Sequence, residues 1–259
     1  MGRSVRWKQR RSNLTADDVD DAGGGYSSLR AAYEKVGPSQ FYAAHGCEYS
    51  NPHADLLDRA LVQAFSAFDS AGALGPREGG VWRALDLACG GGEATLALSR
   101  WWEHSRGGGA CDDDDGGGDG KRKKKRRRGA ALEIDACDPY TADRYAQKTG
   151  GRAEPWSFDD VARGALETRQ PYDLTLASFC LHLLDEEALR ATLGALARRS
   201  RLLCVASPFK KPAIDEASTG WRRVGPEVVE HNQTNEGATR HRVRVRLYQS
   251  SQCKAAEST

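Results

Sequence analysis

The stretch VWRALDLACGGGEATLAL, residues 81–98, decides the fold of this chain. Its first half is a short apolar run that stops abruptly at Cys89-Gly90-Gly91-Gly92, which is typical of a buried β-strand ending in a turn. Glycine lets the backbone bend sharply and lets a ligand lie against the main chain. Residues 93–103 then follow a helical pattern. A strand, a glycine turn and a helix are therefore predicted in succession.

The same alternation continues through the rest of the chain. Further strands are predicted at 130–137, 151–157, 172–179, 201–207, 228–232 and 242–248, and helices at 139–149, 158–166 and 185–199. The last strand alternates as HRVRVRLY, which suits an edge strand with one solvated face. Strands that alternate with helices form parallel sheets covered on both faces. The predicted fold is α/β, with a doubly wound, mostly parallel seven-stranded sheet and helices on both faces.

The N-terminal part has a different character. Residues 1–25 are polar and end in three glycines, so a disordered tail is predicted. In 51–72, Leu57, Leu61, Phe65 and Phe68 recur at helical spacing. We expect a helical N-terminal segment over 26–80, a main domain over 81–250 with a disordered insert at 105–129, and a C-terminal tail at 251–259.

Composition excludes several classes of protein. No stretch approaches the roughly 20 apolar residues that cross a bilayer, and the N-terminus has no apolar core of a secretory signal. The seven cysteines are scattered and form no CxxC pair, which argues against a disulfide framework or a structural zinc site. We therefore expect a protein of the cytoplasm or nucleus, without a membrane contact and without a metal.

The glycine turn separates two ligand classes. A dinucleotide-binding turn follows the pattern G-x-G-x-x-G, and Thr95 stands where its third glycine is required. The pattern hydrophobic-Asp-hydrophobic-small-x-Gly-x-Gly matches instead, from Leu85 to Gly92. Here the chain resembles the class I S-adenosylmethionine-dependent methyltransferases, over about residues 40–250, with Ala88 in place of the usual first glycine. The resemblance implies S-adenosyl-L-methionine as cofactor, bound in part by Asp86, Ala88, Cys89, Gly90 and Gly92.

Three more segments fit this resemblance. Asp138 and Pro139 end the second predicted strand, and a carboxylate there can accept ribose hydroxyls; the alternative is a helix cap. Phe158 and Asp159 are candidates for the adenine, although an acid in a first helical turn is also favoured by the helix dipole. Ser178 and Phe179 match the fourth motif, the floor on which the methyl meets its acceptor, and the resemblance implies that both bind the cofactor.

Two further groups are candidates for the acceptor side. His182 follows the fourth motif and is a candidate general base, or else only packs at the strand end. The segment before the first helix resembles an aromatic lid of small methyltransferases, with the alternative of a helix packed on the sheet. Its candidate lid and substrate residues are Tyr42, His45, Tyr49, Asn51 and His53.

The resemblance implies methyl transfer to an acceptor that the motifs leave open. The fourth motif lacks Asn/Asp-Pro-Pro-aromatic, which disfavours amino groups of nucleic-acid bases; a small molecule or a protein is favoured, with tRNA as a further candidate. The alternative is a non-catalytic methyltransferase-like binding or partner subunit that contacts RNA through Lys121–Arg128. That run of eight cations is also a candidate nuclear-import signal, or simply a solvated loop.

Overall fold

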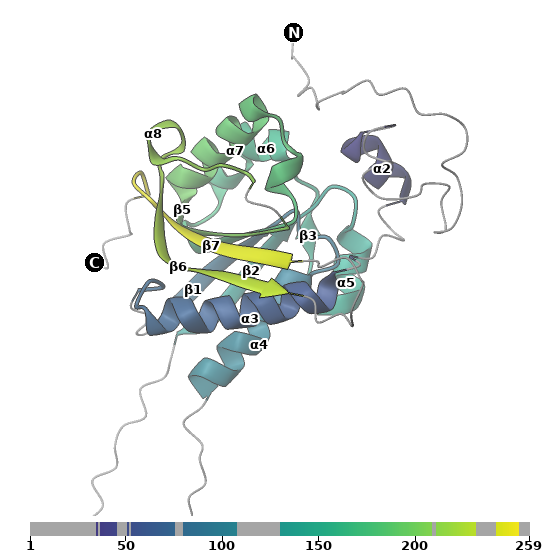
Figure 1. Cartoon of the computed structure of the whole chain (residues 1–259). Coiled ribbons are helices and arrows are strands. Elements are labelled where there is room, and N and C mark those ends of the chain that lie inside the picture. Colours follow the sequence, from purple (N-terminus) through teal and green to yellow (C-terminus); the bar gives the residue numbers. More distant parts are fainter. Residues whose placement is uncertain are drawn as a thin grey trace, which may run out of the picture.

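The computed structural model describes residues 35, 37–45, 51, 53–75, 80–107, 130–208, 211–231 and 242–253. One seven-stranded sheet with the order β3-β2-β1-β4-β5-β7-β6 forms its centre (Figure 1). The strands are β1 (Val81–Leu87), β2 (Ala131–Cys137), β3 (Ala153–Glu154), β4 (Tyr172–Ser178), β5 (Ser200–Ser207), β6 (Trp221–His231) and β7 (Arg242–Ser250).

Helices alternate with these strands along the chain. The α-helices are α2 (Pro38–His45), α3 (Ala54–Ser70), α4 (Glu93–Gly107), α5 (Ala142–Thr149), α6 (Phe158–Ala162), α7 (Glu186–Arg199) and α8 (Glu216–Thr219). Two 3₁₀ turns, η1 (Ala165–Thr168) and η2 (Leu181–Leu183), flank β4.

The strand order places β1 between β2 and β4, and β4 is the central strand of the seven. The chain builds the sheet from β1 outward through β2 to β3, and then returns to β4 on the other side of β1. All pairs from β3 to β5 are parallel, whereas β7 is antiparallel to both β5 and β6. The predicted doubly wound, mostly parallel seven-stranded sheet is confirmed. The carboxyl ends of β1 and β4 form the point where the winding reverses, which is where such sheets bind ligands.

Each strand contributes to two cores because successive side chains point to opposite faces. In β5, Leu202 and Cys204 join the core under α3 and α4, whereas Leu203 and Val205 join the core under α6 and α7. Helices therefore cover both faces of the sheet, as Figure 1 shows.

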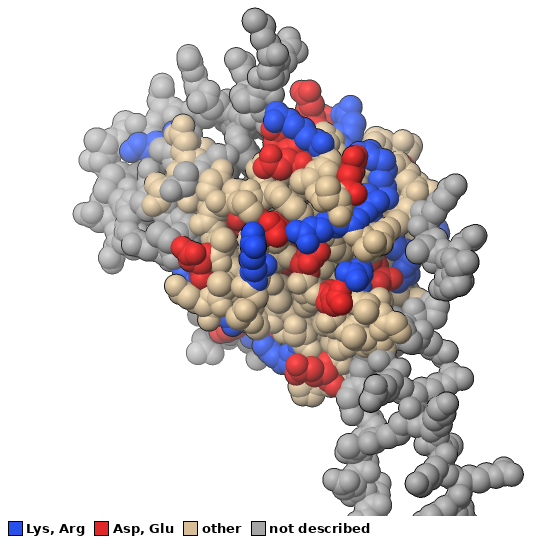
Figure 2. Space-filling view, turned by 180° about the vertical axis from the view of Figure 1, so that it is seen from behind, with Lys and Arg blue, Asp and Glu red and all other residues tan. Residues whose placement is uncertain are grey.

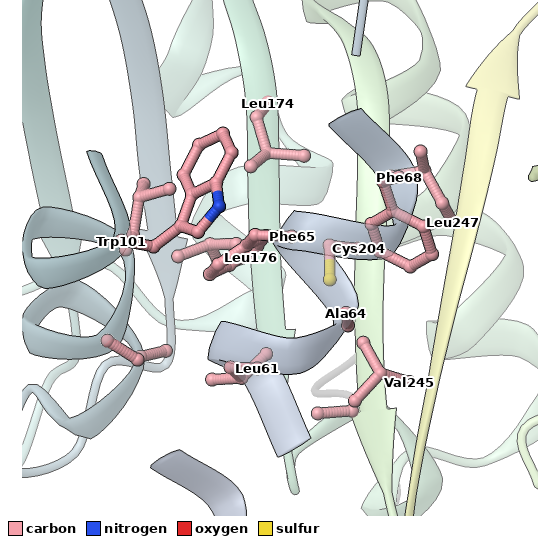
Figure 3. Packing of buried hydrophobic residues seen from close by; sticks show 14 of the residues in the cluster. Leu61, Ala64, Phe65, Phe68, Trp101, Leu174, Leu176, Cys204, Val245 and Leu247 are labelled. Carbon is pink, nitrogen blue, oxygen red and sulfur yellow. The ribbon is translucent and has the colours of Figure 1, made fainter. Parts of the chain in front are cut away.

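Helix α3 is an integral layer of the domain. Phe65 and Phe68 are fully buried, and the Phe65 ring lies 5.5 Å from that of Trp101 on α4, centroid to centroid. Figure 3 shows these rings packed over Leu174, Leu176, Cys204, Val245 and Leu247 of three neighbouring strands. Helix α3 therefore shares its core with β4, β5 and β7, and the predicted division between residues 80 and 81 stays a prediction.

The last two strands differ from the prediction. The expected edge strand, β7, lies between β5 and β6, and Val243, Val245 and Leu247 are fully buried. The edge is β6, which begins seven residues before the predicted 228–232. A register shift between Val224 and Val228 interrupts its pairing, so the residues before this irregularity lack a simple strand pattern.

Smaller differences concern element ends. Helix α4 continues to Gly107, so the first residues of the predicted insert 105–129 are helical. The predicted strand 151–157 is reduced to two residues, and the helix predicted over 158–166 is interrupted at Gly164, whose φ is 103°. The tail 1–25, Tyr49 and Lys121–Arg128 lie outside the described residues. In the described part of the chain, no helix combines the length and the apolar composition that crossing a bilayer requires.

Candidate functional site

A cavity of about 320 Å³ opens at the carboxyl ends of β1, β2 and β4. This volume is within the range of about 300–1,000 Å³ that is usual for small-molecule sites. The cavity is lined by Tyr42, Asn51, Leu87, Ala88, Cys89, Gly90, Glu93, Asp138, Pro139, Tyr140, Thr141, Trp156, Ser157, Phe158, Asp159, Ser178, Phe179, Cys180, Leu183 and Leu184. Most of the predicted cofactor residues therefore lie on one cavity.

The turn after β1 forms the part of the wall with the smallest side chains. Ala88 and Gly90 both have left-handed backbones, with φ of 53° and 56°. The Cys89 amide donates to the Cys137 carbonyl at 3.1 Å, and the Gly90 amide donates to Asp138 Oδ2 at 3.3 Å. The turn is thus tied to the end of β2, and its main chain borders the cavity.

Gly92 has a packing role in the structure. It does not line the cavity, and its φ is 83°. A Cβ at this position would lie 2.5 Å from Thr149 Cγ2 and 3.1 Å from Tyr145 Cδ2, both on α5. The glycine therefore allows α5 to pack closely against the turn. Its predicted contact with the cofactor remains a prediction, and the geometry gives it a different reason to be there.

Asp86 lies beneath the turn, fully buried and outside the cavity wall. Its Oδ2 accepts hydrogen bonds from the Thr95 amide at 3.1 Å and the Thr95 hydroxyl at 2.7 Å, whereas Oδ1 has no partner among the described residues. Burial raises the pKa of this carboxyl to about 7, against the opposing effect of the Thr95 hydrogen bonds. Asp86 thus anchors the start of α4 through Thr95, the residue that stands where a dinucleotide-binding turn requires its third glycine.

Asp138 faces the cavity and also organises the chain around it. Its Oδ1 accepts from the amides of Tyr140 at 2.8 Å and Thr141 at 3.1 Å, which caps the turn that leads into α5. The predicted alternative of a helix N-cap is wrong, because the N-cap residue of α5 is Thr141. Among the described residues, the long bond from the Gly90 amide is the one that Oδ2 accepts. A carboxylate has about four acceptor positions. One side of Asp138 can therefore still accept a hydrogen bond from a hydroxyl in the cavity.

The segment between β3 and α6 supplies aromatic walls. Phe158 and Asp159 line the cavity as predicted, and so does Trp156, which sequence reasoning missed. The Arg169 guanidinium lies 5.2 Å from the Trp156 ring centroid. Asp159 is also paired with Arg163 at 2.7 Å, so its carboxylate is shared between the cavity and an exposed ion pair.

The end of β4 carries a backbone outlier. Phe179 lines the cavity with φ of 53°, its amide donates to the Ala206 carbonyl at 2.9 Å, and its ring stacks on His53. The next residue, Cys180, donates its thiol to the Leu87 carbonyl, and burial raises its pKa. His182, the candidate base, is half-buried with a lowered pKa and is not among the lining residues.

Two N-terminal residues reach the cavity. Tyr42 on α2 lines it and stacks on Tyr140, with 6.3 Å between ring centroids and 17° between planes. Asn51 also lines it, and its Oδ1 accepts from the His53 amide at 2.9 Å. His53 lies behind Phe179 rather than in the wall. The side chain of His45 and all of Tyr49 lie outside the described residues.

Among the described residues, the charges of the wall are of one sign: Glu93, Asp138 and Asp159 are its charged side chains, and none of its residues is a Lys or Arg. Lys148 reaches Glu93 from outside the wall, with 3.0 Å between Nζ and Oε1. Anionic phosphates are normally bound by cations. The wall therefore suits a neutral or cationic ligand better than a pyrophosphate. Glu93 was not predicted, although it directly follows the glycines in sequence.

Comparisons with known proteins give one relative and many similar folds. No family model matches the chain. A Schizosaccharomyces pombe protein described as uncharacterized protein C17A5.05c is 31% identical over 200 residues, which cover 75% of this chain and 79% of that protein.

Among solved structures, magnesium protoporphyrin IX methyltransferase from Synechocystis with bound SAM has a TM-score of 0.47 at 13% identity, covering 93% of this chain and all of that one. A putative RNA methyltransferase from Pyrococcus horikoshii has a TM-score of 0.44 at 15% identity, covering 79% and 89%.

Proposed function

The chain belongs to the same family as the fission-yeast protein C17A5.05c, and from the geometry of the cavity we propose that it is an S-adenosylmethionine-dependent methyltransferase. The observation that carries the proposal is the bond from the Gly90 amide to Asp138 Oδ2, which joins the glycine turn to the acid after β2 at one cavity. This is the juxtaposition that the resemblance to class I methyltransferases implied.

The wall chemistry fits the cofactor. S-adenosylmethionine is a nucleoside that carries a positively charged sulfur, and when bound it supplies a methyl group. A lone pair of the acceptor forms the new bond to the methyl carbon, and the electron pair of the broken carbon–sulfur bond stays on sulfur. Asp138 Oδ2 would accept from a ribose hydroxyl, and Trp156 and Phe158 would bury the adenine. Glu93 would face the ammonium group. Glu93 and Asp159 are each paired with a cation from outside the wall, so among the described residues it is mainly the negative charge of Asp138 that favours a cationic ligand.

The acceptor enters from the remaining side of the cavity. That side is formed by the end of β4 and by the N-terminal residues Tyr42 and Asn51. Closing such a site aligns the reactants and excludes water, which is the main task in this kind of transfer. His182 is half-buried and outside the wall, so proton removal by solvent after transfer agrees better with this geometry than a base role for His182.

The distribution of surface charge bears on the class of acceptor. On the face seen in Figure 2, Lys and Arg side chains are interspersed with Asp and Glu rather than gathered into one basic field. Nucleic-acid binding surfaces are usually enriched in cations. A small molecule or a protein is therefore the favoured acceptor. The alternative proposal, a binding subunit without turnover, shares the cofactor site and differs only in the absence of methyl transfer.

Asp138→Asn tests the cofactor assignment. Loss of a hydrogen bond to a charged group costs about 1.5–3 kcal/mol, which corresponds to about 10- to 150-fold in affinity. The amide can keep one oxygen on the Tyr140 and Thr141 amides, but its NH₂ then meets the Gly90 amide. Asp143→Asn, an exposed acid in the first turn of α5, is the matched control and should bind as the wild type does.

Binding is measured by calorimetry with S-adenosylmethionine, and turnover by radiolabelled methyl transfer into fractions of cell extract. Unchanged affinity in Asp138→Asn would overturn the assignment. Binding without label in small molecules, protein or RNA would favour the non-catalytic alternative.

A further inference from the structure

Phe179 is held in a conformation that large side chains avoid. Its φ of 53° lies in the left-handed region, where a bulky residue is a genuine outlier. Two contacts keep it there: its amide donates to the Ala206 carbonyl of β5, and its ring stacks on His53, with 6.2 Å between centroids and 26° between planes. Such strain concentrates at functional sites. The direction of this ring therefore calls for a functional explanation.

The two residues of this stacked pair differ in their position relative to the cavity. Phe179 belongs to the wall, whereas His53 does not. The imidazole therefore supports the phenyl ring from outside the wall, and Phe179 is an aromatic residue of the wall whose side chain also packs against the core under α3. Aromatic rings stack with planar groups in offset or edge-on arrangements.

The surroundings of this ring are uncharged. The other wall residues from the end of β4 and from the N-terminal segment are Ser178, Cys180, Leu183, Leu184, Tyr42 and Asn51. No described side chain among them could balance a phosphate or a carboxylate. When the neutral S-adenosylhomocysteine replaces the cationic cofactor, an anion would lose its hydration here without gaining a cation among the described residues, which is unfavourable.

We infer that the methyl acceptor presents a planar, uncharged ring that stacks on Phe179. The inference rests on the proposed function, because it assigns the β4 side of the cavity to the acceptor. Phe179 is then a residue that determines specificity through shape, and His53 is a positioning residue that acts through it. A saturated ring of equal size fills the same volume but stacks poorly, so it should bind less well.

The test uses the full chain saturated with S-adenosylhomocysteine and three probes of similar size: phenol, cyclohexanol and benzoate. Binding is measured by ligand-observed NMR titration. We expect phenol to bind about 3- to 10-fold more tightly than cyclohexanol, as estimated from the usual strength of aromatic pairs. Benzoate, which has the ring but carries a charge, should bind more weakly than phenol.

Two variants separate stacking from apolar bulk. Phe179→Tyr keeps the flat ring and should keep the preference for phenol over cyclohexanol. Phe179→Leu keeps apolar volume without the ring and should bind both probes equally. Cyclohexanol binding as well as phenol in the wild type, or an unchanged preference in Phe179→Leu, would overturn the inference.

The cofactor product distinguishes this outcome from failure of the proposed function. If S-adenosylhomocysteine binds and the ring preference is absent, only the acceptor inference fails. If S-adenosylhomocysteine does not bind the folded wild type, the proposed function fails. The probe comparison on the unliganded protein then still decides whether Phe179 forms a ring-binding wall.

Discussion

Substitution of Gly92 by alanine tests the packing of the glycine turn against α5. The new Cβ would lie 2.5 Å from Thr149 Cγ2 and 3.1 Å from Tyr145 Cδ2, and Tyr145 is almost fully buried, so its ring has little freedom to move. The left-handed backbone costs an alanine about 1–2 kcal/mol. Overpacking of a well-filled core adds about 1–3 kcal/mol. We therefore expect Gly92→Ala to lower the free energy of unfolding by about 2–5 kcal/mol.

A matched glycine and a rescue variant separate the two effects. Gly150 has a φ of 72°, and a Cβ there would meet nothing within 4 Å, so Gly150→Ala should show the backbone cost alone. Thr149→Ser removes the clashing methyl and keeps the hydroxyl that donates to the Tyr145 carbonyl and accepts from the Gly151 amide. The Gly92→Ala/Thr149→Ser double variant should therefore recover about 1–3 kcal/mol.

The assay is urea unfolding of the four variants and the wild type, followed by calorimetry with S-adenosylmethionine. Because Gly92 does not line the cavity, the folded double variant should bind the cofactor within threefold of the wild type. The reasoning fails if Gly92→Ala is no less stable than Gly150→Ala. It also fails if the double variant folds well but loses the cofactor, since Gly92 would then contact the ligand directly.

Two further predictions concern the same turn. Ala88→Gly should raise the melting temperature by about 2–4 °C, because glycine relieves about 1 kcal/mol of backbone strain at a φ of 53°. The control Ala146→Gly, on the exposed side of α5, should lower the melting temperature. Equal effects of the two substitutions in calorimetric melts would refute the strain at Ala88. The Asp86 carboxyl has a pKa of about 7 in the folded protein, which is above its value in the unfolded chain. Its contribution to the free energy of unfolding is therefore complete below about pH 4, where the buried carboxyl is neutral, and is lost as the pH rises toward 7. Asp86→Asn should therefore show a smaller fall in melting temperature between pH 4 and pH 8 than the wild type, and an identical fall would contradict the buried, protonated carboxyl.

Local signals in the sequence account for the centre of the sheet and for much of the cavity. The apolar run before Gly90 and the carboxylate of Asp138 each marked the end of a predicted strand. The carboxyl ends of neighbouring parallel strands meet at one edge of a sheet. Their meeting in the structure follows from this rule. Thr95 stands where a dinucleotide-binding turn requires glycine, but the pattern gave no hint that Thr95 would hold Asp86.

What the sequence could not predict depends on contacts between distant segments. The alternation in β7 indicates one buried face, and this is equally true of an edge strand and of an inner strand covered by α3, so its place was missed. A glycine motif shows which residues a turn requires, but not whether each faces a ligand or a helix, as Gly92 illustrates. Trp156 follows a very short strand with little pattern, and the left-handed backbone of Phe179 has no sequence signature.

The most direct test of the central claim is a calorimetric titration of the full wild-type chain with S-adenosylmethionine, set beside a titration with NAD under the same conditions. Three carboxylates and no Lys or Arg in the described part of the wall predict one saturable site for S-adenosylmethionine and no measurable heat with NAD. Binding of NAD, or no heat from S-adenosylmethionine with protein that unfolds cooperatively, would contradict the account.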